Sequence, residues 1–192
     1  MRKFTAVLMM LFLGGCLGGY SPTNKFYYLQ PVDASEVSAL SRKKLSIGVN
    51  DVVLPDYLDR PQIIVFDQGS PQMKIDETNR WGEAPATMIQ RTLAADIAAY
   101  LPQSAVKAKI SLDERFSYLV NVQIVRMDMI EGGEAVFEAW WSVYNAAGNR
   151  LLQQKMALRQ KTDDGFDAYV EAESQMIAAM GRDIAKAVAG LK

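Results

Sequence analysis

The sequence predicts a single α+β domain in which a mostly antiparallel sheet carries two helices on one face. Short segments before residue 76, and again between residues 118 and 160, alternate apolar and polar side chains, as half-buried strands do. Two longer segments repeat apolar residues every three to four positions, which is the period of an amphipathic helix. Each helix has one apolar stripe, so the simplest arrangement buries both stripes on the same sheet.

The first third of the chain is expected to be mainly β-structure. Aromatic and β-branched residues favour strands, and Pro, Gly and Asp clusters separate the segments. The stretch 33–44 is polar and is expected to form a loop or a weak helix. The predicted strands are 26–29, 45–49 with a continuation at 52–54, the apolar and central 62–66, and its hairpin partner 72–75.

A helix is predicted over 85–101, after an approach loop at 79–82. Pro85 suits a first helical turn, where the missing N–H costs nothing. Ile89, Leu93 and Ile97 recur every four residues, and Pro102 ends the helix.

A three-stranded antiparallel meander follows, because its connections at 131–134 and 145–149 are too short for crossovers. The first and last of its strands are expected at 118–128 and 150–160. The last helix starts after Asp164-Gly165 and carries its own apolar stripe. The expected core positions are Val120, Val122 and Ile124, then Phe137, Ala139, Trp141 and Val143, and finally Met176, Met180, Ile184 and Val188.

The N-terminus has the layout of an export signal. Arg2 and Lys3 precede an uncharged apolar run at 4–13, and small residues come before Cys16. The run is about half of the roughly 20 residues that a membrane-spanning helix needs. We therefore predict that residues 1–15 are a cleaved signal peptide and that 26–192 form the exported domain.

Leu13-Gly14-Gly15-Cys16 resembles the lipobox of bacterial lipoproteins. That resemblance implies a diacylglyceryl group and an N-acyl chain on Cys16, and Leu17, which is not aspartate, favours the outer membrane. The alternative is an ordinary signal peptide beside an incidental cysteine. Residues 16–25 would form the lipidated N-terminus and a short tether, whose nine residues after Cys16 reach at most about 30 Å when extended.

The composition excludes several classes of function. Removing residues 1–15 leaves 19 basic against 22 acidic side chains, a net charge of −3, which gives no electrostatic footprint for nucleic acid. The sequence has no histidine and a single cysteine, so the usual zinc sites and His-dependent catalytic triads are absent. We expect no metal, no catalytic residues and no cofactor beyond the covalent lipid on Cys16.

Two segments are candidates for partner contacts. Trp140 lies on the strand face opposite Trp141, so it is partly exposed if the helices cover the face of Trp141; the alternative is a covered second face. The apolar and aromatic loop 53–58 is the other candidate, with local packing as its alternative.

Other clusters have plainer interpretations. Asp163, Asp164, Glu171 and Glu173 are expected to be charges at a helix start and on a solvated face. The methionines of the last helix are expected in the core rather than in a lipid groove. The carboxylates Asp56, Asp59, Asp76 and Glu77 allow a cell-wall glycosidase as a further hypothesis, although nothing in their spacing favours it.

Five segments follow one another along the chain: Phe26-Tyr27-Tyr28-Leu29, Leu54-Pro55-Asp56-Tyr57-Leu58, Trp81 to Pro85, Glu138-Ala139-Trp140-Trp141 and Thr162 to Asp167. In their order and spacing, they resemble the ABC-type transport auxiliary lipoproteins, and in particular the PqiC-like members of that family. The resemblance implies a non-catalytic lipoprotein on the periplasmic face of the outer membrane. It also implies an MCE-domain (PqiB-like) conduit and a PqiA-like membrane protein as partners in lipid transport, with ring-like self-association suited to docking on a ring. Leu54, Tyr57, Glu138 and Trp140 are the expected partner contacts, and a pilotin-like assembly factor is the alternative function.

Overall fold

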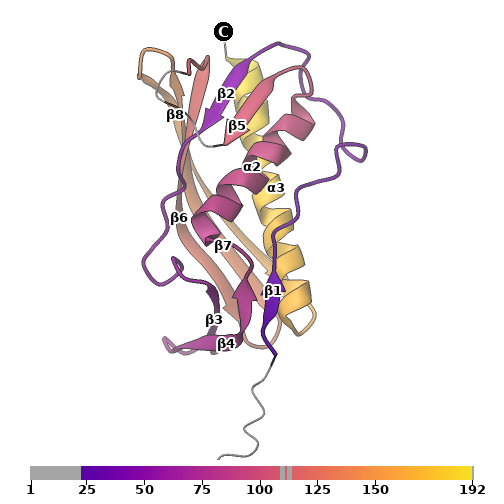
Figure 1. Ribbon diagram of the computed structural model, residues 1–192, viewed down its shortest axis with the longest axis vertical. Helices are drawn as coiled ribbons and strands as arrows, with labels where there is room; N and C mark the ends of the chain where they lie inside the picture. Colours follow the sequence, from indigo (N-terminus) through magenta and orange to yellow (C-terminus); the bar gives the residue numbers. More distant parts are fainter. Residues whose placement is uncertain (1–22, 109–110, 112–113, 192) are drawn as a thin grey trace, which may run out of the picture.

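Eight strands form one sheet, and two helices lie on one of its faces (Figure 1). The computed structural model describes residues 23–108, 111 and 114–191. The predicted signal peptide 1–15, Cys16 and most of the tether lie outside the described residues, so the predicted domain boundaries stay a prediction.

The elements follow one another as strands, a helix, more strands and a final helix. The strands are β1 (Lys25–Tyr27), β2 (Ser46–Val49), β3 (Gln62–Phe66), β4 (Met73–Trp81), β5 (Ala105–Ala108), β6 (Tyr118–Ile130), β7 (Glu134–Asn145) and β8 (Arg150–Lys161); the helices are α2 (Pro85–Tyr100) and α3 (Phe166–Gly190).

The long strand β6 is the centre of the sheet. On one side it pairs antiparallel with β7, which pairs antiparallel with β8. On its other side it pairs in parallel with β2 near its start and with β3 near its end. The β2–β5 and β1–β4 pairs are parallel as well, and β3–β4 is an antiparallel hairpin.

The predicted α+β class with a single domain is confirmed, but the sheet is mixed rather than mostly antiparallel. The parallel pairs join strands that are distant in the sequence, because the chain returns through α2 and long loops before it reaches β5 and β6. The meander of β6, β7 and β8 is antiparallel, as its short connections predict.

Several local predictions need correction. The strand β5 was not expected, and 79–81 ends β4 instead of forming a loop. The expected strand 52–54 is reduced to one backbone bridge between Val53 and Gln123. The segment 33–44 is a loop with a turn, which is the first of the two structures predicted for it.

The core lies between the helices and the strands β6, β7 and β2. The inward residues of β7 are buried, and Trp141 is only 1% exposed. The stripe of α3 is buried as well, which confirms that its methionines pack in the core. The buried residues of this stripe are Met176, Met180, Ile184 and Val188.

The two helices approach closely at Gly181. A Cβ atom built there would lie 2.7 Å from the Cβ of Asp96 on α2 and 3.5 Å from a methyl carbon of Leu93. The nearer atom sits directly on the backbone of a helix, so it has little freedom to move aside. Gly181 thus sets the distance between α2 and α3.

We expect Gly181→Ala to lower the free energy of unfolding by about 1 kcal/mol. Overpacking costs about 1–3 kcal/mol, and replacing a helical glycine by alanine returns about 1 kcal/mol. Urea unfolding measures the change. Gly190→Ala is the matched control, since no atom lies within 4 Å of its Cβ position, and it should not destabilise the protein. Equal destabilisation by both variants would contradict the close approach.

Candidate docking surface

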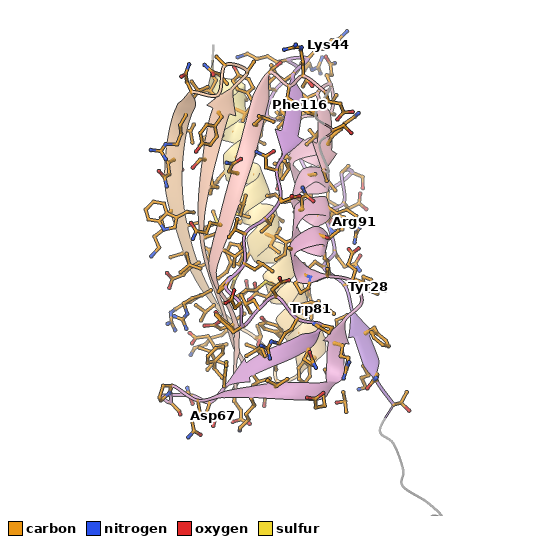
Figure 2. The ribbon with its side chains drawn as sticks, turned by 60° about the vertical axis from the view of Figure 1, so that its left-hand side comes forward. Tyr28, Lys44, Asp67, Trp81, Arg91 and Phe116 are labelled. Carbon is orange, nitrogen blue, oxygen red and sulfur yellow. The ribbon has the colours of Figure 1, made fainter. Side chains whose placement is uncertain are left out.

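The face of the sheet turned away from the helices is the candidate functional surface, and we name it the open face. The alternation along β7 sends Trp141 to the helices and Trp140 to the open face, where it is 39% exposed. Trp140 stands between Gln123 of β6 and Lys155 of β8 in the strand register. Figure 2 shows this side of the molecule, with the long strands in front of α3 and with α2 to their right.

A shallow groove of about 440 Å³ lies beside Trp140 on the open face. Val53, one of the most exposed apolar residues described, lies on its wall. Most of the remaining walls are amide or hydroxyl side chains, which can donate and accept hydrogen bonds without carrying charge. These include Asn50, Asn121, Gln123, Ser142 and Gln153.

A chain of charged and polar groups runs across the open face next to Trp140. The hydroxyl of Tyr57 donates to Oδ1 of Asp128 at 2.9 Å, and the Nε of Arg126 donates to Oδ2 of the same carboxylate at 2.7 Å. Nη1 of Arg126 lies 3.7 Å from Glu138, whose other oxygen is 2.9 Å from Nζ of Lys155. The structure therefore brings together Tyr57 and Glu138, two of the residues predicted from sequence, through Arg126 and Asp128.

The surroundings of these charged and polar side chains determine which of them are ionised. Burial, and next the charge of Asp128, raise the pKa of Tyr57, so its hydroxyl keeps its proton. The hydrogen bond from Lys155 lowers the pKa of Glu138, so that carboxylate is ionised. These groups hold one another in place, because each is paired with its neighbour within the fold.

Glu173 was expected on a solvated face, and that expectation is wrong. Its side chain is fully buried under the sheet, on the same stripe side of α3 as Tyr169. Burial, followed by the charge of Asp128, raises its pKa well above the usual value, so the carboxyl group is neutral at ordinary pH. The Tyr169 hydroxyl nearby donates to the backbone oxygen of Met127 at 3.2 Å.

The four predicted contact residues differ in their accessibility. Leu54 packs against the core and lines a small internal space, so it serves local packing. Tyr57 is half-buried, and Glu138 is mostly covered by its ion pairs. Trp140 alone among the four presents a large apolar surface to solvent.

Sequence reasoning missed Val53, Arg126 and Asp128 as parts of this surface. Arg126 and Asp128 are two residues apart and are the only charged residues of β6, which could have placed them on one face. The bulge between Ile124 and Arg126 shifts the alternation by one residue, so simple counting from Val120 puts them on the wrong face.

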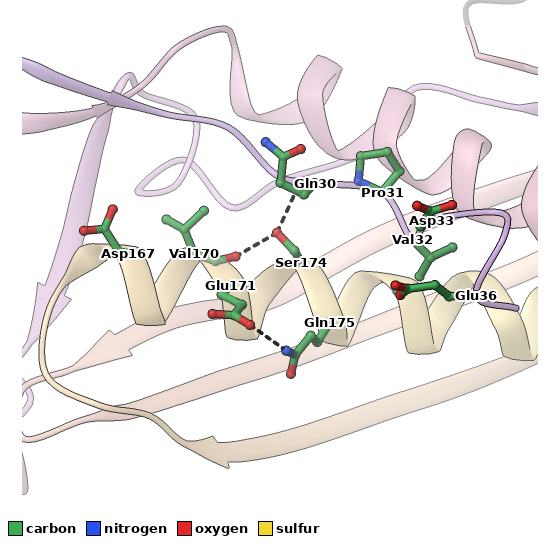
Figure 3. Close-up of a pocket in the computed structure, with 11 residues that line it drawn as sticks. Gln30, Pro31, Val32, Asp33, Glu36, Asp167, Val170, Glu171, Ser174 and Gln175 are labelled. Atoms are coloured by element: carbon green, nitrogen blue, oxygen red, sulfur yellow. Dashed lines mark hydrogen bonds between the residues drawn. The ribbon is translucent and has the colours of Figure 1, made fainter.

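A second groove, of about 420 Å³, lies on the helix side of the molecule, between the segment 30–36 and α3 (Figure 3). Its charged side chains are the acidic Asp33, Glu36, Asp167 and Glu171. The hydroxyl of Ser174 accepts from the backbone N–H of Gln30 at 3.0 Å and donates to the carbonyl of Val170 at 2.7 Å. Ser174 therefore holds the N-terminal segment on α3 and is not an available nucleophile.

A family model described as ABC-type transport auxiliary lipoprotein component matches residues 27–185, nearly the whole described domain. The chain belongs to this family. The sequence resemblance is thereby confirmed, and the chain is a transport auxiliary lipoprotein, a class that is anchored to a membrane. Among the described helices, none is long and apolar enough to span a bilayer. The described residues also contain no cluster of ligands suited to a metal ion.

Solved structures similar to this lipoprotein show the same fold. One crystal structure of an uncharacterised protein has 22% identity and a TM-score of 0.71, covering 86% of this chain and 99% of its own. A DUF330-family protein from Xanthomonas campestris has 14% identity and a TM-score of 0.61, covering 86% of this chain and 91% of its own. The dodecameric PelC from Paraburkholderia phytofirmans has 8% identity and a TM-score of 0.50, covering 80% and 93%. Among curated proteins, no sequence matches the chain significantly.

Proposed function

We propose that this lipoprotein is a non-catalytic, outer-membrane-anchored component of an intermembrane lipid transport system. In this proposal its lipid anchor is Cys16, carrying diacylglycerol and an N-acyl chain, and its domain lies on the periplasmic face. It docks an MCE-domain (PqiB-like) conduit and works with a PqiA-like membrane protein. The observation that carries the docking role is Trp140, an exposed tryptophan beside a mainly polar groove in a transport auxiliary lipoprotein.

The surroundings of Trp140 support a protein contact. Binding hot spots are enriched in tryptophan and tend to lie within a rim of polar groups that exclude water. Here the groove amides lie on one side of Trp140, and the pair of Glu138 with Lys155 lies beside it. A flat, polar surface with one aromatic anchor fits a docking module better than it fits an enzyme pocket.

Self-association into a ring is part of the same proposal. In the part of the chain that the structure describes, β8 is an edge strand of twelve residues that pairs only with β7. An exposed edge of this length is a template for pairing with another chain. PelC, which has the same fold, was crystallised as a dodecamer, so the fold is compatible with a large homo-oligomer.

The test compares Trp140→Ala with Leu40→Ala in the lipidated protein. Both residues are exposed and apolar, but Leu40 lies in the loop beside the C-terminal end of α2, where its N–H donates to the carbonyl of Tyr100. The measurement is the amount of MCE-domain protein recovered with the lipoprotein from detergent-solubilised membranes. We expect recovery to fall at least tenfold for Trp140→Ala, since a hot-spot tryptophan contributes about 2 kcal/mol or more.

Leu40→Ala should recover the partner as the unchanged protein does. Equal recovery by the Trp140 variant, with the partner present in the cells, would remove the open face from the docking role.

A further inference from the structure

Large apolar side chains are exposed at the end of the domain where the described chain begins. Phe26 on β1 is 61% exposed, and Met73 and Ile75 on β4 are 48% and 41% exposed. The strand β1 pairs with the last residues of β4, Phe26 opposite Arg80, whereas Met73 and Ile75 lie at the start of β4. Figures 1 and 2 place β1, β3 and β4 together at this end, opposite the C-terminus and Lys44. We name Phe26, Met73 and Ile75 the apolar end.

The exposure of the apolar end is not a simple extension of the core. Met73 and Ile75 share one face of β4, and their partners across the hairpin are Phe66 and Ile64. Ile64 is buried, whereas Ile75 is not. The Nζ of Lys74, the residue between Met73 and Ile75, lies 2.6 Å from Asp67 and 3.4 Å from Glu131, so its charge is paired within the fold. Exposed apolar side chains on strands that lie at the same end of a domain are candidates for a contact surface.

The length of chain before β1 indicates that the apolar end contacts the membrane. Eight residues separate Cys16 from Lys25, and an extended chain of that length spans about 30 Å at most. A lipidated Cys16 therefore holds the apolar end close to the bilayer. The tether also gives a high effective concentration of membrane, in the millimolar range for short flexible linkers, so even a weak apolar contact is populated.

The local chemistry suits the surface of a bilayer. Phe26 is flanked by exposed Lys25 and by Tyr28, which is 47% exposed and whose hydroxyl donates to the carbonyl of Gly82 at 3.4 Å. Aromatic rings with polar tips, next to a lysine that can reach lipid phosphates, are typical of membrane interfaces. A strand of three residues at the sheet edge can also enter the headgroup region without exposing a long ladder of unpaired backbone groups.

We propose that the apolar end is a membrane-contact surface, with Phe26, Met73 and Ile75 inserted into the leaflet that holds the lipid on Cys16. This inference rests on the lipid anchor of the proposed function. It fixes the orientation of the domain, with β1 and the β3–β4 hairpin on the membrane and the end that carries Lys44 pointing into the periplasm. The open face is then perpendicular to the membrane and free to meet a partner.

The test measures the membrane depth of single introduced cysteines in the full, lipidated protein. Cys16 is the only cysteine in the sequence, so its thioether leaves the introduced thiol as the single site for an environment-sensitive fluorophore. Phe26→Cys and Met73→Cys are labelled at the apolar end, and Lys44→Cys is labelled at the opposite end as the matched control. The proteins are reconstituted in vesicles of phosphatidylethanolamine and phosphatidylglycerol that contain spin-labelled quencher lipids.

We expect the quencher lipids to reduce the fluorescence at positions 26 and 73 at least threefold more than at position 44. Equal quenching at the three positions would overturn the proposal. Shielding of the fluorophores at positions 26 and 73 from water that depends on protein concentration and not on lipid would overturn it as well, because a second copy of the protein would then cover the apolar end. The number of fluorophores per chain, read by mass spectrometry, separates the two proposals. Two labels would mean that Cys16 is free, which is a failure of the lipid anchor rather than of the surface.

Discussion

Replacing Trp141 by alanine is expected to lower the free energy of unfolding by about 3–5 kcal/mol, the usual cost of removing a large aromatic side chain from a core. Trp141 is 1% exposed and packs within the core under the helices. Trp140, the next residue, is 39% exposed, so its replacement by alanine should cost less than about 1 kcal/mol. Replacing Trp141 therefore tests the stability of the fold, whereas replacing Trp140 tests partner binding.

Urea unfolding followed by circular dichroism measures this difference without relying on tryptophan fluorescence. The midpoint should shift strongly for Trp141→Ala and little for Trp140→Ala, with a similar slope in both cases. A reversed order, or equal shifts, would mean that the helices cover the other face of β7. The same pair also validates the docking test, because a stable Trp140 variant loses binding for local reasons only.

Raising the pH from 5 to 8 is expected to destabilise the protein by about 3 kcal/mol through Asp96. Asp96 lies on α2 with its side chain fully buried, and its Oδ1 accepts the N–H of Val32 at 2.8 Å. Burial raises its pKa to about 7, and the hydrogen bond from Val32 offsets only part of that rise. The acid is thus neutral in the folded protein at low pH, and ionising it inside the fold is unfavourable.

The direction of the effect follows from the two pKa values of this group. In the unfolded chain Asp96 ionises near the ordinary aspartate pKa of 3.8, whereas in the fold its pKa is about 7. The contribution of Asp96 to the free energy of unfolding is therefore complete below pH 4, falls as the pH rises toward 7, and is lost above pH 7. The raised pKa of Glu173 acts in the same direction, while the lowered pKa values of Glu138 and Asp76 oppose it only in the acidic range, below their unfolded values.

Urea unfolding of the unchanged protein and of Asp96→Asn, at pH 5 and pH 8, tests this expectation. The amide still accepts the N–H of Val32 but cannot ionise, so the difference between the two pH values should shrink by about 3 kcal/mol. Glu173→Gln is the control at the other buried carboxyl group. It should remove a separate part of the change in the free energy of unfolding with pH. An unchanged pH dependence in Asp96→Asn would show that Asp96 is hydrated or otherwise paired in solution.

The sequence was informative where structure depends on neighbours along the chain. The period of Ile89, Leu93 and Ile97 predicts α2, and the short turns predict the antiparallel β6–β8 meander. The parallel pairs were not predictable, because the partner of β2 is chosen by burial across about 70 residues and not by a local turn. The short strand β5 has no strong pattern of its own and forms because it completes the edge beside β2.

The candidate surface was predictable only in part. Alternation along β7 was sufficient to separate Trp140 from Trp141. The bond between Tyr57 and Asp128 joins residues 71 positions apart, and the bulge in β6 hides the shared face of Arg126 and Asp128 from simple counting. Glu173 was misjudged because an acidic residue near a helix start is usually solvated, whereas here α3 turns that position toward the sheet.

The central claim is that the open face around Trp140 docks the conduit of a transport system. The most direct measurement is crosslinking in intact cells with a photoreactive residue at position 140 of the lipidated protein, and at position 40 as the matched control. We expect position 140 to capture an MCE-domain protein and position 40 to capture none. Capture of a secretin-like channel, or of cell-wall material alone, would contradict it and favour an assembly factor or a cell-wall protein instead.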